Sequence, residues 1–584
     1  MNGSPSARRT LAAVAVALAA APLLLGNQPG GARPASATFE RYAVAADEAS
    51  ASDVGAAILE QGGTAADAAA ATMLALGITS PLSSGFGGGG FALYYRASDR
   101  SVTFLDFRER APAASRPDMF APAQGERPED RATQPSQVGG LAVGVPGEPA
   151  GIEELLRRFG RLGRRAVVAP AIRMAQAGVP ISEYVAGLSM PFVDDLRRDP
   201  IMRGWVGEGE TAMRAGALMR NAALARTLEA FSARGARAVY RGAIAQQIAR
   251  AVRQAGGILT PRDLADYRVV ERTPLEGSYF GYRFVTAPPP SAGGYTMLAS
   301  LAQLERVLPR DRFCRASEPN RVHALAESWK GPFRDRAVYF GDPDHVTLPL
   351  DALRAAARTE ARARAYDPRR ALDPEAYAMP LEGEPRAPTA QPRSGGTTHL
   401  CVVDAEGNVA AVTTTVNLFF GARFTAAGLV MNDEMDDFAR AIGAPNAFGL
   451  PGGPQNLPGP GKRPVSTMTP TIVIGDAGPV LCIGGAGGSR IVTATEQVAL
   501  RILAQHLPLD RALAAPRFHH QGFPNVLNYE PSLDAQTQAA MRGRGHRLEE
   551  MEHIAAVQAI QIRPTAPRLL AASDPRKGGA PAGR

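Results

Sequence analysis

The stretch Gly395-Gly396-Thr397-Thr398-His399 opens an alternating apolar run that ends at Val403, turns through Asp404-Ala405-Glu406-Gly407-Asn408 and returns along the Thr-rich residues 409–416. Alternation on both sides of a short polar turn predicts two paired β-strands. The glycines before Thr397 predict a turn at the start of the first strand.

Thr397 is a candidate nucleophile. A Thr at a chain start can use its own α-amine as the base, because that amine titrates near neutral pH. Thr397 would become such a residue if the Gly396-Thr397 bond were cut, and Gly396 permits the strained backbone that brings the Thr hydroxyl onto the preceding carbonyl. The alternative is a glycine turn leading into an edge strand, with Thr present for its β-propensity.

A second glycine-rich turn, Cys482-Ile-Gly-Gly-Ala-Gly-Gly-Ser489, follows a predicted strand and precedes the helical run 491–503. Consecutive glycines beside a helix start expose backbone N–H groups that could stabilise an oxyanion. A plain strand-to-helix turn is the alternative.

Charged residues could hold a zwitterion. Arg108 could bind a carboxylate with two hydrogen bonds, and the acidic cluster 434–437 could hold an ammonium. Ordinary surface salt bridges are the alternative.

Helices and strands are mixed along the chain. Residues 53–78 predict two Ala-rich helices broken at Gly62-Gly63, with Thr64 and Asp67 as a capping box for the second. Further helices are expected at about 149–159, 167–177, 222–255, 295–307 and 319–331, and strands at 91–95, 102–107, 282–286, 399–403, 409–416, 471–474 and 480–483.

Composition excludes several classes. With 584 residues, 45% of them hydrophobic, the chain is globular, and its formal charge of +8 is too dispersed for a nucleic-acid surface. Three distant Cys and eight His without HExxH or HxH spacing predict neither disulfides nor a structural metal. The run Gly85–Gly90 matches GxGxxG, but a strand follows it where dinucleotide binding needs a helix. The sequence has neither a GxSxG nor a Walker motif.

The ends and linkers also carry signals. Residues 1–37 predict an export signal, with Arg8-Arg9, an apolar stretch over 11–25 and a cleavage site at Ala35-Ser36-Ala37; a retained anchor is the alternative. Residues 354–396 are rich in Arg, Ala and Pro and predict a linker. Residues 443–464 hold six Gly and six Pro and predict a surface loop that could be a lid.

Taken together, the motifs resemble the γ-glutamyltranspeptidase family of N-terminal-nucleophile hydrolases over nearly the whole mature chain. The matching stretches are Gly62-Gly-Thr-Ala-Ala-Asp67, Ser84–Phe91, Asp106-Phe-Arg-Glu109-Arg-Ala-Pro, Val145-Pro-Gly, Gly257-Ile-Leu-Thr, Asp263–Tyr267, Pro288–Gly294, Gly341-Asp-Pro-Asp344, Thr397-Thr-His399, Asn432–Phe438, Lys462-Arg-Pro464, Gly487-Gly-Ser-Arg-Ile491 and Asp574-Pro-Arg-Lys-Gly-Gly579.

The resemblance implies a four-layer αββα sandwich of the N-terminal-nucleophile type, built from two self-cleaved segments. These would be a large subunit, 38–396, and a small catalytic subunit, 397–584, forming a heterodimer. The implied activity is the transfer of a γ-glutamyl group from glutathione or related amides to water, an amino acid or a peptide. It implies no cofactor, metal or nucleic acid, and an exported, periplasmic or secreted location.

The resemblance also implies roles for single residues. Gly396-Thr397 would be the cleavage site, Thr397 the nucleophile and Thr415 its supporting hydroxyl. Gly487 and Gly488 would form the oxyanion hole. The donor's α-carboxylate would bind Arg108, Ser466 and Thr467, and its α-ammonium Asn417, Glu434 and Asp437.

At two places the sequence differs from the family's usual pattern, and both bear on specificity and turnover. Ser466-Thr467 replaces the family's usual Ser-Ser, which keeps the hydroxyl and adds a methyl group. Phe448 stands in the lid where many bacterial members carry Tyr, so it has no hydroxyl to bond Asn417. The glutaryl-cephalosporin acylases, which also cleave themselves before Thr or Ser, are an alternative reading, as is a catalytically silent exported protein that binds γ-glutamyl or peptide ligands.

Overall fold

The computed structural model describes residues 33–121, 134–381 and 395–584, so most of the predicted export signal lies outside the described residues. The chain separates into a unit that ends at Pro34 and a unit from Ala35 to Arg584, and the helices and strands lie in the second. Within the described residues, no helix is both long and apolar enough to span a bilayer.

Two antiparallel sheets of seven strands each form the centre of the second unit. Sheet A has the order β1 (Ser36–Phe39), β20 (Leu569–Ala572), β19 (Ala556–Ile562), β15 (Gly478–Ala486), β14 (Thr471–Gly475), β9 (Tyr282–Thr286) and β8 (Leu275–Tyr279). Sheet B has the order β21 (Ala582–Gly583), β2 (Ala43–Ala46), β10 (Gly396–Val403), β11 (Val409–Asn417), β3 (Gly89–Arg96), β4 (Ser101–Phe107) and β7 (Val270–Arg272). Each sheet mixes strands from before and after Gly396.

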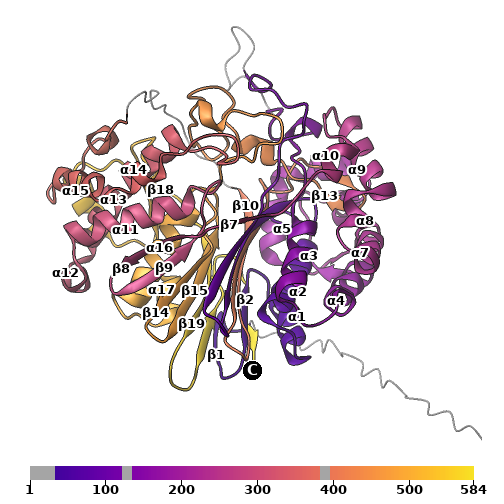
Figure 1. The fold of residues 1–584 in the computed structure, drawn as a ribbon, viewed down its shortest axis with the longest axis horizontal. Helices are drawn as coiled ribbons and strands as arrows, with labels where there is room; N and C mark the ends of the chain where they lie inside the picture. Colours follow the sequence, from indigo (N-terminus) through magenta and orange to yellow (C-terminus); the bar gives the residue numbers. More distant parts are fainter. Residues whose placement is uncertain (1–32, 122–133, 382–394) are drawn as a thin grey trace, which may run out of the picture. The chain divides into compact units, whose positions relative to one another are not determined.

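Helices cover the outer face of each sheet, which confirms the predicted αββα architecture (Figure 1). Over sheet B lie α1 (Ala49–Glu60), α2 (Ala65–Thr79), α3 (Glu148–Phe159), α4 (Arg164–Ala177), α7 (Ala222–Arg234), α8 (Arg237–Tyr240) and α9 (Gly242–Gln254). On the side of sheet A lie α11 (Gly293–Val307), α12 (Arg310–Arg315), α13 (Glu318–Tyr339), α14 (Leu350–Arg354), α15 (Ala356–Ala365), α16 (Arg490–Leu503), α17 (Leu509–Ala514) and α18 (Ala535–Gly543). The short helices α5 (Glu183–Ser189), α6 (Val193–Arg198) and α10 (Pro261–Ala265) lie in the connections.

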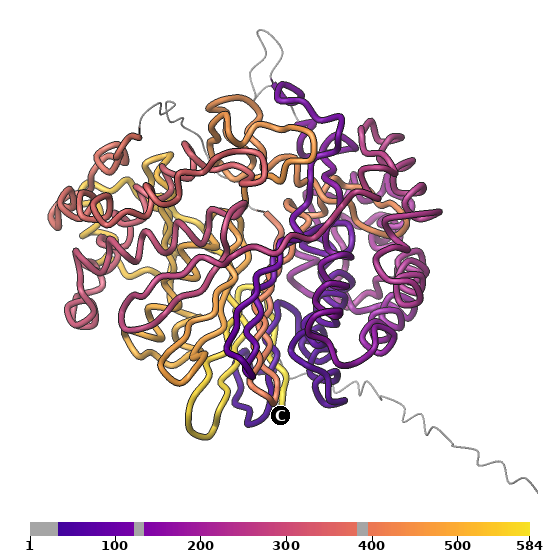
Figure 2. The backbone as a smooth tube through the Cα atoms, viewed as in Figure 1, coloured from indigo at the N-terminus to yellow at the C-terminus, as the bar shows by residue number. Residues whose placement is uncertain are grey.

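Strand alternation explains how four layers form from one sequence pattern. In β10, Leu400 and Val402 belong to the core between sheet B and its helices, whereas Cys401 and Val403 belong to the core between the two sheets. Because both faces of the strand are apolar, both are buried, and the two sheets stack directly on each other. The tube view shows the segments of both sheets running side by side through the centre (Figure 2).

The helix predictions are confirmed with two adjustments. The capping box of Thr64 and Asp67 starts α2, whose Ala-rich surface is buried on nearly every side. The predicted helix over 222–255 is divided into α7, α8 and α9 at Gly235 and Gly242, which have φ of +70° and +73°. The predicted helix over 319–331 continues through Pro332 to Tyr339.

The expectation of no disulfide is wrong. Cys401 on β10 and Cys482 on β15 form a disulfide across the space between the sheets, with 5.9 Å between their α-carbons. The two residues are 81 positions apart, so neither spacing nor a CxxC pattern could indicate the pairing. Cys314 is free.

The predicted linker over 354–396 is folded over much of its described length. Helix α15 lies within it, and Arg358 and Arg362 are buried and paired with Asp335 of α13, at 2.5 and 2.7 Å. Some of the Arg residues in this stretch therefore form buried ion pairs. A search for an apolar helix face does not find a helix that is buried in this way. Residues 382–394 of this stretch lie outside the described residues.

Two other stretches differ in detail from expectation. The predicted surface loop 443–464 is irregular, but Ala447, Phe448 and Leu450 are buried within it. At the other end of the chain, Ser36 and Ala37 pair with β20 in sheet A, so removal of residues 1–37 would take away half of β1.

Candidate active site

Thr397 lies at the start of β10, in an intact chain. Its Oγ1 donates to the carbonyl oxygen of Gly396 at 2.8 Å, and Thr415 Oγ1, on the neighbouring β11, donates to the same oxygen at 2.6 Å. The two hydroxyl oxygens are 3.3 Å apart. The ladder between β10 and β11 is irregular between Gly396 and Thr398, so Thr397 sits in a bulge. The Gly396 carbonyl oxygen thus accepts two hydrogen bonds. One of them comes from Thr397, the residue that would attack this carbonyl.

The second glycine turn lies between β15 and α16, as predicted. Gly487 and Gly488 have φ of +143° and +63°, conformations that favour glycine. A Cβ on Gly487 would come within 2.7 Å of the Ala555 α-carbon, so the turn is also closely packed. The turn can therefore present unpaired N–H groups that a larger residue would displace.

Arg108 is almost completely buried at the end of β4, and acidic side chains surround its guanidinium. Nη2 is 2.5 Å from Asp437, and Nη1 forms an ion pair with Glu434. Both acids lie on one short 3₁₀ helix, Glu434–Asp437. Burial raises the pKa of Glu434, and Arg108 opposes that rise. The structure thus brings Arg108, Glu434 and Asp437 together, and their charges neutralise one another.

The segment 464–467 connects this cluster with the glycine turn. Arg108 Nε donates to the Pro464 carbonyl at 3.3 Å, and Thr467 Oγ1 donates to the Gly488 carbonyl at 3.0 Å. Ser466 lies between them, with its hydroxyl accepting from Met468 N at 3.1 Å. Ser466 and Thr467 therefore lie between the charged cluster and the candidate oxyanion hole.

Asn417 ends β11 two residues after Thr415. Its N–H donates to Thr415 Oγ1 at 2.8 Å and its side-chain amide donates to the Asp433 carbonyl at 3.0 Å, next to Glu434. Its φ of +77° is a conformation that Asn tolerates better than most residues. Asn417 thereby links the Thr pair to the acidic helix.

Phe448 covers the site from the irregular loop. A Cβ added to Gly395 or to Gly488 would overlap the Phe448 ring, so this ring lies between the scissile region and the glycine turn. Gln521 holds the loop, because its side-chain amide donates to the carbonyls of Phe448 and Gly449 at 3.3 and 3.2 Å. Sequence reasoning missed Gln521, which lies in an irregular segment without a motif.

The glycine run Gly85–Gly90 serves close packing. A Cβ on Gly87 would collide with the Val430 carbonyl, one on Gly88 with the Thr415 carbonyl and one on Gly90 with the Thr413 carbonyl. The run leads into β3, as expected for a loop that approaches backbone closely. It helps to fix β11, and with it Thr415.

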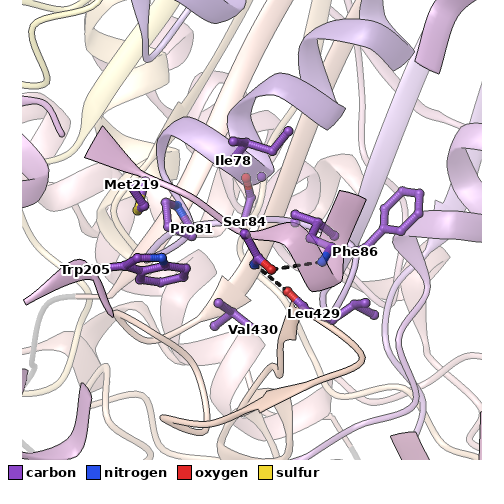
Figure 3. Close-up of a pocket in the computed structure, with 13 residues that line it drawn as sticks. Ile78, Pro81, Ser84, Phe86, Trp205, Met219, Leu429 and Val430 are labelled. Atoms are coloured by element: carbon purple, nitrogen blue, oxygen red, sulfur yellow. Dashed lines mark hydrogen bonds between the residues drawn. The ribbon is translucent and has the colours of Figure 1, made fainter. Parts of the chain in front are cut away.

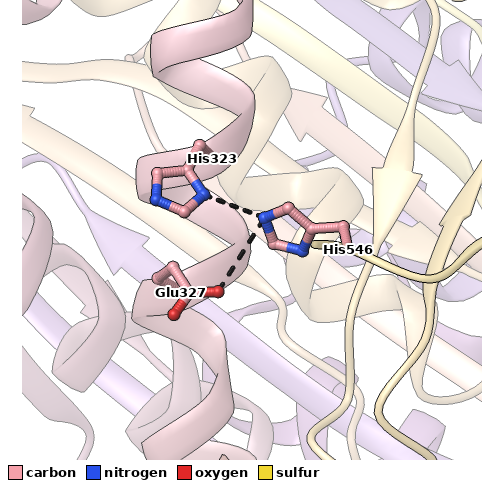
Figure 4. A group of neighbouring side chains, drawn as sticks. All are labelled: His323, Glu327 and His546. Atoms are coloured by element: carbon pink, nitrogen blue, oxygen red, sulfur yellow. Dashed lines mark hydrogen bonds and ion pairs between the residues drawn. The ribbon is translucent and has the colours of Figure 1, made fainter. Parts of the chain in front are cut away.

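One group of side chains outside this site has the composition of a metal site. His323 and Glu327 of α13 lie beside His546, with their possible ligand atoms within 4.8 Å of one another (Figure 4). Their atoms are already engaged, since His323 Nδ1 is 2.8 Å from His546 Nε2 and Lys330 Nζ is 2.6 Å from Glu327 Oε1. An ammonium in contact with the carboxylate disfavours a dication there, so the group fits a buried hydrogen-bond network better. The sequence did not indicate it, because His546 is 223 residues from His323.

A small cavity also lies beside the start of β3. It is lined by residues including Ile78, Ser84, Phe86, Trp205 and Leu429 and has a volume of about 20 Å³ (Figure 3). That volume holds about one water molecule. It is too small for an amino-acid substrate.

Comparison with known proteins identifies relatives of the chain. The sequence model described as "Gamma-glutamyltranspeptidase" matches residues 51–584. A glutathione hydrolase proenzyme of Escherichia coli is 36% identical over 91% of this chain and 90% of its own length, and one of Bacillus subtilis is 33% identical over 88% and 86%.

Solved structures agree with the fold. A cephalosporin acylase from Bacillus halodurans has a TM-score of 0.79 at 25% identity, over 96% of this chain and 98% of its own. The gamma-glutamyltranspeptidase of Helicobacter pylori has a TM-score of 0.50 at 32% identity, over 56% of this chain and 91% of that chain.

Proposed function

The chain belongs to the gamma-glutamyltranspeptidase family, and on that premise we propose that it cuts itself at Gly396-Thr397 and then uses Thr397 as the nucleophile of a γ-glutamyl hydrolase and transferase. The contact of the Thr397 and Thr415 hydroxyls with the Gly396 carbonyl carries the proposal. Glutathione and related γ-glutamyl amides are the substrates, in accordance with the curated relatives.

Self-cleavage begins at the Gly396 carbonyl. The Thr397 hydroxyl oxygen attacks this carbonyl carbon, and its proton passes to the Thr397 nitrogen. The C–N bond between Gly396 and Thr397 then breaks to leave an ester and a free α-amine. Water then hydrolyses the ester, which leaves Gly396 with a carboxylate and Thr397 as a chain start. Thr415 supports the step by donating to the carbonyl oxygen as negative charge develops on it.

Turnover repeats the chemistry on the substrate. The α-amine of Thr397 accepts the hydroxyl proton as the oxygen attacks the γ-glutamyl carbonyl, and the N–H groups of Gly487 and Gly488 stabilise the oxyanion. The leaving amine departs with a proton and a glutamyl ester remains on Thr397. Water or the amine of an amino acid or peptide then attacks this ester, which gives hydrolysis or transfer.

The charged cluster selects the glutamyl group. The donor's α-carboxylate binds Arg108, Ser466 and Thr467, and its α-ammonium binds Asn417, Glu434 and Asp437. Without a substrate, Arg108 is neutralised by Glu434 and Asp437. A substrate lacking one of its two charges would leave part of this buried cluster unpaired, which is costly.

The family assignment argues against the two alternative readings. The curated relatives are glutathione hydrolases, whereas the cephalosporin acylase resembles this chain in fold at lower sequence identity. A glutaryl group carries no ammonium for Glu434 and Asp437. Membership of an enzyme family with the Thr pair in place also disfavours a silent binding protein.

The two products remain together as a heterodimer, because each sheet contains strands from both and separation would expose their shared cores. We also propose that residues 1–37 act as an export signal, which places the enzyme in the periplasm or outside the cell. Sequencing the N-terminus of the large subunit from cells that export it tests the signal; an intact Met1 would contradict it.

Thr397→Ala tests the mechanism, with Thr397→Ser as the matched control. The Ala variant should remain one uncut chain without activity, and the Ser variant should yield two fragments. Intact mass and N-terminal sequencing should find Thr-Thr-His-Leu at the start of the wild-type small fragment and Ser-Thr-His-Leu in the Ser variant. Activity towards a γ-glutamyl anilide should greatly exceed that towards the matching glutaryl anilide. A normally cut Ala variant would disprove the mechanism.

A further inference from the structure

Lys577 contacts the nucleophilic residue directly. Its Nζ donates to the carbonyl oxygen of Thr397 at 2.5 Å and to Asp47 Oδ2 at 2.8 Å. The side chain is buried, and its ammonium lies 5.4 Å from the centre of the Tyr184 ring. The family motifs place Lys577 in a tail segment but give it no role.

The contact fills a gap in sheet B. On one side, β10 pairs with β2 from Leu400 to Val403, and β2 ends at Ala46, before it reaches Thr397. On the other side, the register between β10 and β11 skips Thr397. The Thr397 carbonyl therefore lies where both ladders are interrupted, and a buried carbonyl needs a donor. Lys577 supplies it.

The choice of lysine is notable in this chain. The sequence contains 61 Arg and three Lys, at 330, 462 and 577. Lys330 donates to the Leu372 carbonyl and Lys462 to those of Gln455 and Leu457, so all three donate to backbone oxygens. An ammonium is a compact point charge with three donors on a flexible stem.

We propose that Lys577 positions Thr397 for catalysis by holding its carbonyl oxygen, and that its positive charge favours the neutral, proton-accepting form of the α-amine released by self-cleavage. This inference rests on the proposed role of Thr397. After cleavage Thr397 loses its covalent link to Gly396, and the contact with Lys577 becomes one of the few that hold it. Both residues belong to the small fragment, whereas Asp47 belongs to the large one.

The charges near Lys577 come from several elements. Asp47 follows β2, Glu48 precedes α1, Tyr184 is on α5 and Asp574 is in the C-terminal segment. Burial raises the pKa of Glu48 to about 7, so Glu48 is largely neutral in acid. Asp574 is paired with Arg517 and Arg576.

Asp47 is the main opposing charge, and it binds Lys577 and Gln558. Lys577 contacts the residue that carries the α-amine, whereas the contact of Asp47 is with Lys577. A like charge lowers the pKa of an amine, and after the offset from Asp47 we expect roughly one pH unit. The α-amine would then serve as a base at lower pH.

A pair of variants separates charge from packing. Lys577→Met combined with Asp47→Asn removes both charges without leaving a buried carboxylate unpaired, and Lys577→Arg keeps the charge. Lys330→Met combined with Glu327→Gln is the matched control, because it also removes a buried ammonium together with the carboxylate that it binds. Intact mass spectrometry of the wild type first establishes that the chain is cut before Thr397. An uncut wild-type chain would refute the proposed function and not this inference.

The readout is the pH dependence of kcat/KM for a γ-glutamyl anilide in the cleaved enzymes. The acidic limb should move up by roughly one pH unit in Lys577→Met/Asp47→Asn, so that kcat/KM at a pH below that limb falls about tenfold. The limb should remain near the wild-type position in Lys577→Arg and in Lys330→Met/Glu327→Gln. An unchanged limb in the double variant would overturn the inference.

A measurement on the wild type serves if the double variant fails to mature. Lysine labelled with ¹³C at Cε gives three signals, and that of Lys577 should shift at the pH of the acidic limb because it feels the titrating α-amine. Blocking Thr397 with an acylating inhibitor should remove the shift. Failure of all three signals to respond at that pH would refute the inference.

Discussion

Phe448 lies directly on Gly488, so that a Cβ on this glycine would overlap the aromatic ring. Gly395 contacts the same ring from the side of the scissile bond. One apolar side chain therefore closes the space between the candidate nucleophile and the candidate oxyanion hole. The position of the predicted lid and that of the glycine turn thus depend on each other.

Gly488→Ala should reduce turnover. The new methyl group meets Phe448, and a φ of +63° is unfavourable for alanine. Displacement of one oxyanion donor lowers kcat by roughly 10²–10³-fold. The control is Gly545→Ala, which has a φ of +88° but no neighbour within 4 Å of the added Cβ. Steady-state kinetics on the two variants should separate them; similar activities would exclude Gly488 from the reaction.

Phe448→Tyr should favour transfer over hydrolysis. A Cβ added to Gly395 would lie 2.5 Å from Phe448 Cζ and 3.2 Å from the Asn417 carbonyl oxygen, so the end of the ring and Asn417 both border Gly395. One added hydrogen bond stabilises the closed lid by about 0.5–1.5 kcal/mol, which corresponds to a two- to tenfold change. Product ratios with and without a dipeptide acceptor give the measurement, with Phe448→Leu as the control that lacks a hydroxyl. Equal ratios in Tyr and Leu variants would contradict the prediction.

Local patterns predicted those parts of the molecule in which neighbours in sequence are neighbours in space. The alternation around the turn at Asp404 gave the β10–β11 pair, and with it the contact of Thr397 with Thr415. The capping box of Thr64 and Asp67 gave the start of α2. In both cases the residues in contact lie within one strand pair or one helical turn, so the local sequence pattern is enough to predict the contact.

Contacts between distant segments could not be predicted in this way. Cys401 and Cys482 meet because two sheets stack, and Gln521 reaches the predicted lid from a segment after α17. Arg358 and Arg362 fall in the predicted linker, because their partner, Asp335, lies on another helix and the local sequence does not indicate the pairing. Side chains that are polar in sequence can be buried when their charges are paired, and composition does not reveal the pairing.

Removal of the disulfide should destabilise the enzyme without separating its fragments. Cys401 and Cys482 both follow residue 396, so on a denaturing gel without reductant the cleaved enzyme should still give two bands. A loop of 81 residues predicts a loss of about 4 kcal/mol in the free energy of unfolding. Denaturant unfolding of Cys401→Ala/Cys482→Ala measures this loss, and Cys314→Ala is the control. A single band without reductant would contradict the pairing.

Asp335→Asn should destabilise the described part of the supposed linker. Asp335 pairs with Arg358 and Arg362 and accepts a hydrogen bond from Tyr295, all in a buried environment. Removing one partner of a buried ion pair typically costs 3–5 kcal/mol. Glu360→Gln is the matched control, because its pair with Arg364 is exposed and 4.0 Å long, and such pairs contribute about 0–1 kcal/mol. Limited proteolysis should cut near α15 in the Asn variant first, and equal resistance of both variants would argue against a folded linker.

Glu496→Gln should stabilise the protein at alkaline pH. Glu496 lies on α16, fully buried, where it accepts hydrogen bonds from Ser300 Oγ and Trp329 Nε1 at 2.8 and 3.0 Å. Burial raises its pKa to about 8, although the two hydrogen bonds lower the pKa. The folded chain therefore retains a proton that the unfolded chain releases above about pH 4.5.

The direction in which stability changes with pH follows from this difference in bound protons. The contribution of Glu496 to stability is fully present below pH 4.5 and decreases by up to about 1.4 kcal/mol per pH unit as the pH rises to 8. Glutamine does not titrate, so the stability of Glu496→Gln relative to the wild type should increase over this range and level off above pH 8. Chemical unfolding at pH 5, 6.5 and 8 measures it, with the exposed Glu552→Gln as the control. A difference between Glu496→Gln and the wild type that is the same at all three pH values would mean that Glu496 is ionised in the folded protein.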